Sequence, residues 1–338
     1  MGSLAPEPQK LYIETPCIPS PPLSRAAGCN IFLKLENLQP SGSFKSRGIG
    51  TMMHRALRSH PSGAAHFYSS SGGNAGLACA TAATTLAQPC TIVVPRTTPD
   101  HVIAKMRALG AAVHQVGADW ASADRHLREA LVARDPDAVY VPPFDHPHVW
   151  EGASTIVDEL VRQTRGLGGD VDGIVCACGG GGLLNGIMDG VAKNYAAGPR
   201  PRVLAVETVG ADSLDTSVRA GELVTLPAIT SIATTLGASR VSARTFEHSR
   251  EKHFCNTVVT DAEAVMGTAR LADNARLLVE VACGAAVAPV YNGRLKAMLG
   301  KGLSDEEWSR KIVVLIVCGG QNISLDMLRK YQQEFGVE

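Results

Sequence analysis

The chain has 338 residues, and its 32 Lys and Arg balance its 32 Asp and Glu, so the formal net charge is zero. This balance argues against a nucleic-acid partner, and the longest apolar run, residues 312–318, is too short to cross a membrane. A chain of this length can form two domains.

Apolar runs of strand length alternate with helical patterns along almost the whole chain. The expected strands cover residues 31–35, 66–69, 90–94, 112–116, 139–141, 173–177, 203–207 and 312–317. The expected helices cover residues 45–59, 74–86, 100–109, 120–134, 150–164, 183–195, 261–274 and 282–299. This alternation predicts an α/β fold, in which mostly parallel sheets carry helices on both faces.

The nine cysteines are scattered through apolar surroundings. Cys176 and Cys178 form a C-x-C pair, but no second pair or histidine stands at zinc-site spacing. We therefore expect reduced, mostly buried thiols. The segment up to Thr15 has neither a signal-peptide core nor the arginines of a transit peptide, so we expect a cytoplasmic rather than a mitochondrial protein.

Ligands of parallel α/β sheets bind where strands end and helices begin, and three loops there are rich in glycine. Gly179-Gly180-Gly181-Gly182 follows the strand expected at 173–177 and precedes a helix. Bare amides at a helix N-terminus favour a phosphate, whereas a tight turn needs only one or two glycines. Neither the Walker lysine nor the dinucleotide spacing is present.

The other two loops differ in chemistry. Ser70-Ser71-Gly72-Gly73-Asn74 follows the strand expected at 66–69, and its hydroxyls and amides suit a carboxylate. Ser and Asn also cap helices without any ligand. Cys318-Gly319-Gly320-Gln321-Asn322 follows the last expected strand.

Lys45 begins a helix after the turn Ser41-Gly42-Ser43-Phe44. A lysine that forms a Schiff base with a cofactor is partly desolvated, which lowers its pKa. A single lysine in a Ser/Gly turn is more often a solvated surface residue. On local grounds alone, the catalytic interpretation of Lys45 is the weaker one.

Four motifs in this order resemble those of the L-serine/L-threonine dehydratases, fold-type II pyridoxal-phosphate enzymes with the tryptophan synthase β-like fold. They lie at residues 41–48, 70–76, 179–183 and 317–320. The likeness extends from about Thr15 to about Leu328 and looks closest to the catabolic L-serine dehydratases of animals and fungi. It implies α,β-elimination of L-serine to pyruvate and ammonia, with L-threonine as a second substrate.

The resemblance implies a role for each residue of the motifs. Lys45 forms the Schiff base and removes the α-proton, Phe44 packs against the ring, and Asn74 hydrogen-bonds the 3-oxygen. The residues implied to bind the cofactor are Phe44, Lys45, Asn74, Gly179, Gly180, Gly181, Gly182 and Cys318. The residues implied to bind the substrate carboxylate are Ser71, Gly72, Gly73 and Asn74.

By the same resemblance, Cys318 faces the ring nitrogen. A thiol does not keep that nitrogen protonated, so the cofactor is a weaker electron sink and loss of the β-hydroxyl is favoured over racemisation. A monovalent cation, potassium, is also implied. Its implied ligands are Gly179, Glu207, Ala211, Ser213, Leu236 and Ala238. Glu207 at a strand end could instead be a capping or surface residue.

The resemblance further implies two three-layer α/β domains, one of residues 1–37 and 146–338 and a smaller one of residues 38–145, with the cofactor between them. It implies a homodimer active in amino-acid catabolism and gluconeogenesis. Four residues depart from the family pattern: Ala153 for His, Val281 for Pro, Thr235 for Ala and Gly72 for Ala. The last two leave substrate preference open.

The alternatives to serine dehydration share the scaffold. A related enzyme would dehydrate threonine or another β-hydroxy amino acid, racemise serine, or carry out β-replacement. A homologue without activity would only bind an amino acid. The presence of Lys45, Asn74 and the four-glycine loop argues against that last alternative.

Overall fold

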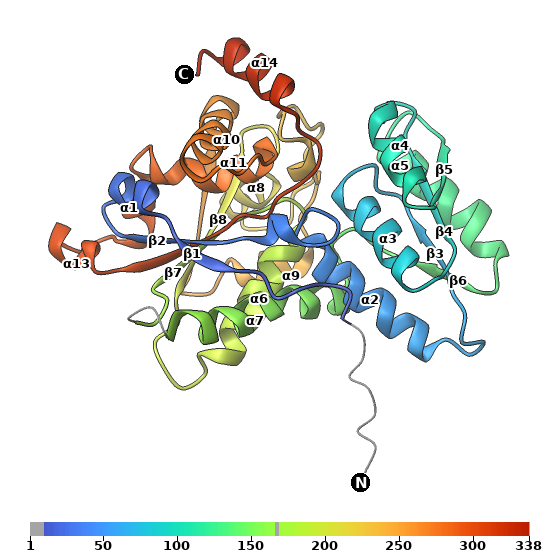
Figure 1. The fold of residues 1–338 in the computed structure, drawn as a ribbon, viewed down its shortest axis with the longest axis horizontal. Helices are drawn as coiled ribbons and strands as arrows, with labels where there is room; N and C mark the ends of the chain where they lie inside the picture. The colour runs from blue at the N-terminus through green and yellow to red at the C-terminus, as the bar shows by residue number, and fades with distance from the viewer. Residues whose placement is uncertain (1–9, 166–168, 338) are drawn as a thin grey trace, which may run out of the picture.

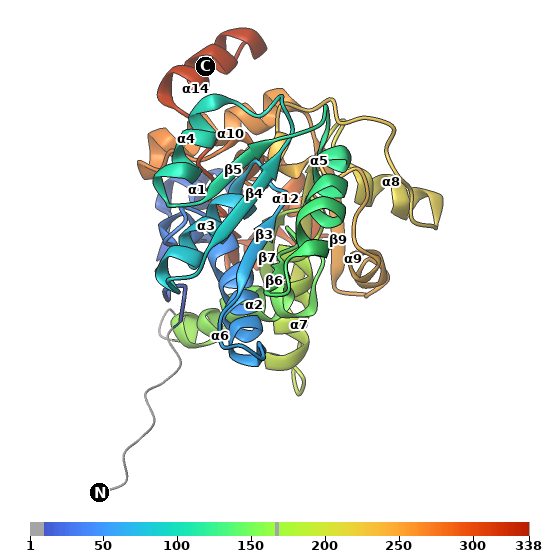
Figure 2. The same ribbon diagram turned by 90° about the vertical axis from the view of Figure 1, so that its right-hand side faces the viewer.

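The computed structural model describes residues 10–165 and 169–337 of the chain. Two sheets lie side by side, and helices cover both faces of each (Figures 1 and 2). Residues 1–9, which belong to the expected large domain, lie outside the described residues. The α/β prediction with mostly parallel sheets is confirmed.

The larger sheet has the strand order β1-β2-β10-β7-β8-β9. Every neighbouring pair is parallel except β1 with β2. Its strands are β1 (Cys17–Pro19), β2 (Asn30–Lys34), β7 (Gly173–Ala177), β8 (Arg202–Thr208), β9 (Phe254–Val259) and β10 (Ile312–Ile316). The central strands β7 and β10 are buried throughout, and their carboxyl ends lead to the four glycines and to Cys318.

The smaller sheet is parallel throughout and has the order β5-β4-β3-β6. Its strands are β3 (His66–Ser69), β4 (Cys90–Val94), β5 (Ala112–Gln115) and β6 (Ala138–Tyr140). The strand β3 leads directly into the Ser/Gly/Asn loop. All eight predicted strands are present with bounds that differ by at most one residue, whereas β1 and β9 were not predicted.

The helices that cover the sheets are labelled in Figures 1 and 2 where there is room. They are α1 (Pro21–Ala27), α2 (Lys45–Ser59), α3 (Asn74–Thr85), α4 (Asp100–Ala108), α5 (Trp120–His126), α6 (Pro147–Arg165), α7 (Gly182–Asn194), α8 (Ser213–Ala220), α9 (Ala243–His248), α10 (Asp261–Ala275), α11 (Val281–Val287), α12 (Arg294–Leu299), α13 (Asp305–Ser309) and α14 (Leu325–Phe335). In the described part of the chain, no helix combines the length and apolar character needed to span a membrane.

One predicted helix was wrong. Residues 282–299 form two short helices, α11 and α12, joined by a 3-10 turn and a loop. Pro289 lies in the 3-10 turn, and Gly293 precedes α12 with φ of +76°. Both residues interrupt a continuous helix, because proline lacks an N–H and glycine favours the left-handed region.

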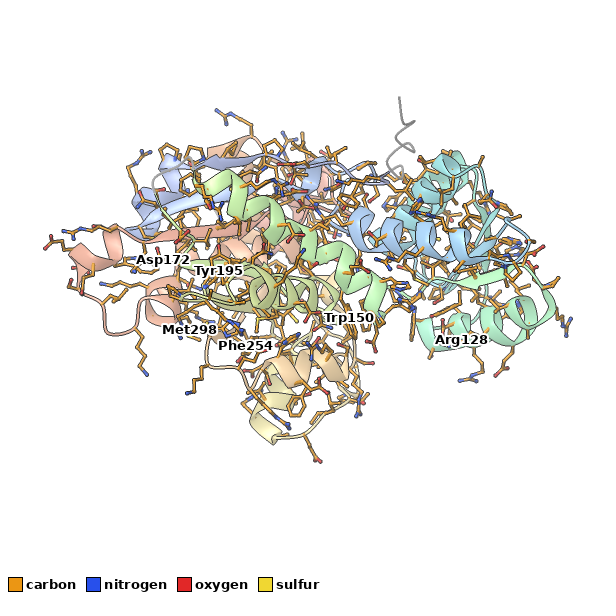
Figure 3. The ribbon with its side chains drawn as sticks, turned by 90° about the horizontal axis from the view of Figure 1, so that it is seen from below. Arg128, Trp150, Asp172, Tyr195, Phe254 and Met298 are labelled. Atoms are coloured by element: carbon orange, nitrogen blue, oxygen red, sulfur yellow. The ribbon has the colours of Figure 1, made fainter. Side chains whose placement is uncertain are left out.

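Helix α2, which begins at Lys45, contacts both parts of the molecule. It packs against α6 beside the larger sheet and against α3 beside the smaller one. Its backbone touches α6, since a Cβ on Gly152 would lie 2.3 Å from the carbonyl oxygen of Arg47. Viewed from below, Trp150 near the start of α6 lies between the part that contains Asp172 and the part that contains Arg128 (Figure 3).

A buried ionic cluster fixes the first turn of α2. The guanidinium of Arg47, which is fully buried, donates to Glu36 Oε2 at 2.7 Å and to Glu159 Oε1 at 2.6 Å. Lys34 Nζ donates to Glu159 and, at 2.6 Å, to the carbonyl of Thr15. The two basic and two acidic side chains balance, so no net charge is buried. The cluster joins α2 to α6, β2 and the N-terminal segment.

All nine cysteines are free thiols, and all except Cys17 are buried. This agrees with the expectation of reduced, mostly buried thiols. Cys176 and Cys178 belong to the core around β7, where burial raises the pKa of both thiols. They have the environment of packing residues rather than of metal ligands.

Candidate active site

Lys45 is the first residue of α2, and its side chain is partly buried. Its Nζ donates to the carbonyl oxygen of Pro143 at 2.6 Å and lies 5.0 Å from the centroid of the Phe44 ring. Burial, the largest effect, lowers its pKa to about 8. The amine is therefore far more often neutral near neutral pH than an exposed lysine, as a nucleophile or proton acceptor requires.

The segment that precedes Lys45 is attached to the end of β10. Phe44 N–H donates to the carbonyl of Cys318 at 3.1 Å, and Ser43 forms an isolated antiparallel bridge with Gly319. Two predicted site residues far apart in sequence, Phe44 and Cys318, thus lie next to each other. The pKa of the Cys318 thiol is raised by the neighbouring Cys283 thiol and by burial, so Cys318 is neutral.

The four glycines form the turn between β7 and α7, and the last three, Gly180 to Gly182, leave no room for a side chain. A Cβ on Gly180 would lie 2.5 Å from the Phe144 ring, and one on Gly181, where φ is +96°, would lie 1.7 Å from Thr245 Oγ1. Within residues 10–165 and 169–337, the N–H groups of residues 179–183 donate to no protein acceptor. Free amides at the start of a thirteen-residue helix form an anion site.

The Ser/Gly/Asn loop reaches the same region from the smaller sheet. Ser71 Oγ accepts a hydrogen bond from Gly73 N–H at 3.3 Å, and Asn74 begins α3. Asn74 is attached to the larger part of the molecule: its Nδ2 donates to Glu280 Oε2 at 3.0 Å, and its Oδ1 accepts from Gln321 N–H at 3.2 Å. The loop therefore faces the loop after β10.

Glu280 is a residue of this region that was not predicted. Its side chain is only 4% exposed and accepts hydrogen bonds from three other segments. A signal for it exists in the sequence, because Glu280 is the single charged residue among residues 277–290. An isolated charge in such a run is buried against specific partners when the run is buried.

Three departures from the family pattern have local explanations. A Cβ on Gly72 would lie 2.9 Å from Thr98 Oγ1, so the glycine permits close contact with Thr98. A Cβ on Gly186 would lie 2.4 Å from the Cβ of Ala153, so a small residue at 153 allows α6 and α7 to approach. Thr235 donates its hydroxyl to Glu280 Oε2 at 2.8 Å.

Glu207, at the end of β8, is completely buried. Its two oxygens accept the N–H groups of Leu214 and Asp215, both at 2.8 Å, so Glu207 caps the first turn of α8. Burial, the largest effect, raises its pKa to about 8.

The other residues expected to bind potassium differ in their contacts. A Cβ on Gly179 would lie 3.1 Å from Leu236, whereas Ala211 pairs with Thr208 and Ser213 begins α8. Ala238 N–H donates to the carbonyl of Leu236 at 2.7 Å. In the described ranges, no three His, Cys, Asp or Glu residues are grouped as metal ligands would be. A site made largely of carbonyl oxygens has no such signature.

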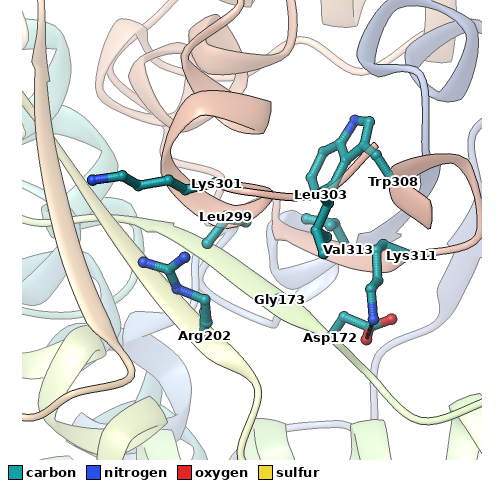
Figure 4. Close-up of a pocket in the computed structure, with 9 residues that line it drawn as sticks. All are labelled: Asp172, Gly173, Arg202, Leu299, Lys301, Leu303, Trp308, Lys311 and Val313. Atoms are coloured by element: carbon teal, nitrogen blue, oxygen red, sulfur yellow. Dashed lines mark hydrogen bonds and ion pairs between the residues drawn. The ribbon is translucent and has the colours of Figure 1, made fainter. Parts of the chain in front are cut away.

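A separate pocket lies at the opposite edge of the larger sheet (Figure 4). It is lined by Gly173 and Arg202, the first residues of β7 and β8, by Val313, the second residue of β10, and by the ion pair between Lys311 Nζ and Asp172 Oδ1 at 2.8 Å. The candidate site lies instead at the carboxyl ends of β7, β8 and β10. The pocket is therefore not part of it.

Comparison with known proteins agrees with this geometry. A family model described as pyridoxal-phosphate dependent enzyme matches residues 9–319. The chain belongs to this family. It is 44% identical over 329 residues to the L-serine dehydratase/L-threonine deaminase of Bos taurus, and the match covers 97% of both chains. It is 39% identical to the catabolic L-serine/threonine dehydratase of Saccharomyces cerevisiae, covering 90% of this chain and 86% of that one.

A solved structure shares the fold over the whole chain. The fungal L-serine ammonia-lyase from Rhizomucor miehei superimposes with a TM-score of 0.87 at 36% identity, covering 97% of this chain and 100% of that one. This family is the one expected from the four motifs.

The residues at the site fit the family's cofactor. Pyridoxal phosphate requires an amine, an anion site for its phosphate and partners for the ring. Lys45 supplies a partly desolvated amine, and residues 179–183 supply free amides at a helix N-terminus. Phe44 and Cys318 lie beside Lys45, as a ring face and a ring nitrogen partner require.

Proposed function

We propose that this protein is a pyridoxal-phosphate-dependent L-serine dehydratase, a lyase that converts L-serine to pyruvate and ammonia. The observation that carries the proposal is Lys45, whose amine lies between Phe44 and the Pro143 carbonyl with its pKa lowered to about 8. The relatives in cattle, yeast and Rhizomucor miehei, whose names all include L-serine as substrate, support the choice of reaction.

Bound pyridoxal phosphate supplies an electron sink for the bond between Cα and its hydrogen. The chain supplies binding and proton transfer. The free amides of residues 179–183 would bind the phosphate, and Phe44 would pack against the ring. Ser71 and the amides around Gly72 and Gly73 would bind the substrate carboxylate. Lys45 Nζ, freed by the arriving amino acid, would take the α-proton.

Cys318 favours elimination over racemisation in this proposal. The pKa of its thiol is raised, so Cys318 is neutral and would leave a ring nitrogen beside it without a charge that keeps it protonated. Lys45 would then give the proton taken from Cα to the β-hydroxyl, which leaves as water, rather than return it to Cα. The remaining aminoacrylate takes up water and yields pyruvate and ammonia.

The test supplies L-serine, L-threonine and D-serine separately and measures keto acid and enantiomer composition. We expect pyruvate from L-serine and slower formation of 2-oxobutyrate from L-threonine. D-serine should not form from L-serine faster than pyruvate does. Lys45→Ala should lose at least about 10³-fold in turnover, since it removes nucleophile and base together. Lys193→Ala, on the exposed face of α7, is the control.

Each rival has its own outcome in this test. Racemate that accumulates faster than pyruvate would identify a racemase, and a higher rate with L-threonine would identify a threonine dehydratase. Full turnover in Lys45→Ala, or no Schiff-base absorbance at about 410–420 nm in the purified protein, would overturn the proposal and favour a binding protein.

We further propose a potassium ion near Glu207. A cation would balance the buried carboxyl, whose pKa is raised to about 8 by burial, and the carbonyls of Gly179, Ala211, Leu236 and Ala238 with Ser213 would complete its shell. Turnover in potassium should exceed turnover in lithium or tetramethylammonium at equal ionic strength. Glu207→Gln should lose this difference, and an unchanged dependence would overturn the cation proposal.

A homodimer, a cytoplasmic location and a role in amino-acid catabolism and gluconeogenesis also remain proposals. They rest on the family resemblance. Light scattering at several protein concentrations would test the dimer.

A further inference from the structure

Glu280 is buried between the two parts of the molecule, and the hydrogen-bond donors to its side chain in the described part of the chain are neutral. Its Oε1 accepts from the N–H of Asn322 at 2.6 Å. Its Oε2 accepts from Nδ2 of Asn74 at 3.0 Å and from Oγ1 of Thr235 at 2.8 Å. The donors belong to three different segments: the loop after β10, the start of α3 and the 3-10 turn at Thr234–Leu236.

Burial of the Glu280 carboxyl group is unfavourable, and it requires a glycine at position 320. Burial raises the pKa of Glu280 despite the three donors and the charge of Lys105, which both lower it. Gly320 passes so close that a Cβ there would lie 2.2 Å from Glu280 Cδ, and its φ is +106°, where glycine is favoured. Glu280 directly precedes α11 but does not cap it with its side chain. A helix-capping role therefore does not account for it.

The contacts of Glu280 determine the orientation of the Asn74 amide. Asn74 Oδ1 accepts from Gln321 N–H, and one N–H of Nδ2 is donated to Glu280. A flipped amide would put two donors together at Gln321 and two acceptors together at Glu280. The second N–H of Nδ2 is thereby left available to a ligand.

Thr235 adds a donor that an alanine at this position cannot provide. Its hydroxyl is committed to Glu280, and its methyl carbon lies 3.8 Å from where a Cβ on Gly73 would be. The methyl group of Thr235 therefore lies next to the loop that is expected to bind the substrate. With Thr235 in place of alanine, Glu280 therefore has one more hydrogen-bond donor.

We propose that Glu280, secured by Thr235, is a positioning residue that presents the Asn74 N–H to the 3-oxygen of pyridoxal phosphate. This inference rests on the proposed function, because it needs the cofactor to bind at Lys45. Glu280 touches no reacting atom and acts through Asn74.

The test titrates cofactor-free protein with pyridoxal phosphate and follows tryptophan fluorescence and visible absorbance. In Glu280→Gln an amide nitrogen meets either the Asn74 amide or the Asn322 N–H, so the three donors cannot all be accepted and the dissociation constant should rise about tenfold or more. Thr235→Val keeps the shape but removes one donor, and a rise of about threefold is expected. Glu263→Gln, at the N-terminus of α10, is the control with no expected change.

A double variant separates positioning from stability. In Glu280→Gln with Asn74→Asp, the glutamine donates to the aspartate, which also accepts from Gln321 N–H, so the link between the two parts is restored. No N–H is left for the cofactor. We expect the thermal midpoint of the cofactor-free protein to recover while cofactor affinity stays at least about tenfold weaker than in the wild type.

Two results would overturn the inference: unchanged affinity in Glu280→Gln, whatever its thermal midpoint, or full recovery of affinity in the double variant. Should Glu280→Gln not fold, Thr235→Val alone decides, and unchanged affinity counts against the inference. Failure of the proposed function looks different, because wild-type protein would then show only the absorbance of the free cofactor on titration and no Schiff-base band.

Discussion

At the start of α2, the amine of Lys45 has lost much of its solvent and keeps one carbonyl partner. Phe44, its neighbour in the sequence, belongs to the turn before α2. The other parts of the site come from distant segments: Asn74, the glycine turn and Cys318 each follow a parallel strand. The chemistry of the site therefore depends on residues whose local environments are individually ordinary.

The lowered pKa of Lys45 predicts the pH dependence of cofactor uptake. Below a pH of about 8 the amine is mostly protonated and cannot attack the aldehyde, and above it the amine is neutral. The rate of uptake by cofactor-free protein should rise about tenfold per pH unit below 8 and level off above it. Stopped-flow absorbance measures this rate, and an Nα-acetyl-lysine series corrects for ionisation of the cofactor. A rise that continues to about pH 10 would contradict the lowered pKa.

Arg47 has a measurable structural role two residues after Lys45. Arg47→Met leaves Glu36 and Glu159 buried with one cation between them, so unfolding should become easier by about 3–5 kcal/mol. Denaturant unfolding measures this difference. Arg55→Met is a matched control, because Arg55 pairs with Glu151 between the same two helices but on the surface, where about 0–1 kcal/mol is expected. Equal losses in both variants would contradict the role of the cluster.

At the scale of elements, most of the fold was predictable because the buried parallel strands read as apolar runs. The strands β1 and β9, both at sheet edges, were not predicted: β1 has only three residues and ends in a proline, and β9 carries Asn256 and Thr257 among apolar residues. The break between α11 and α12 had a visible cause in Pro289 and Gly293. The site motifs were predictable from their resemblance, whereas Glu280 was not, because its role depends on partners from three segments.

The position of Lys45 depends most directly on the close packing of α2 against α6. Gly152→Ala would place a methyl 2.3 Å from the carbonyl oxygen of Arg47 and 2.7 Å from Gly48 Cα. We expect a loss of about 1–3 kcal/mol in stability and lower turnover, since α2 must shift. Gly198→Ala, which meets no heavy atom within 4 Å, is the control. Wild-type turnover and stability in Gly152→Ala would contradict this dependence.

At the scale of the whole molecule, the candidate site joins two sheets that have separate cores. Ser71 and Asn74 come from the smaller part, and the four glycines and Cys318 come from the larger part. A cofactor bound there contacts both parts, so it stabilises their arrangement as well as each part.

Removal of the cofactor should therefore lower the unfolding temperature. At a concentration about 100-fold above its dissociation constant, a ligand of the native state contributes about 2.7 kcal/mol. Differential scanning calorimetry of the protein with and without pyridoxal phosphate measures this effect. Lys45→Ala should show a smaller difference, and equal midpoints in the wild type would mean that the cofactor does not bind the folded protein.

The buried cluster around Arg47 also has a consequence for proteolysis. Thr15 accepts from Lys34 Nζ through its carbonyl and donates its hydroxyl to Glu36 Oε1 at 2.5 Å, so the N-terminal segment closes the cluster. A protease that trims the chain only as far as Lys10 leaves these bonds intact. A protease that cuts beyond Thr15 removes these bonds and exposes the buried charged side chains to water. Loss of this short N-terminal segment would therefore change the position of Lys45.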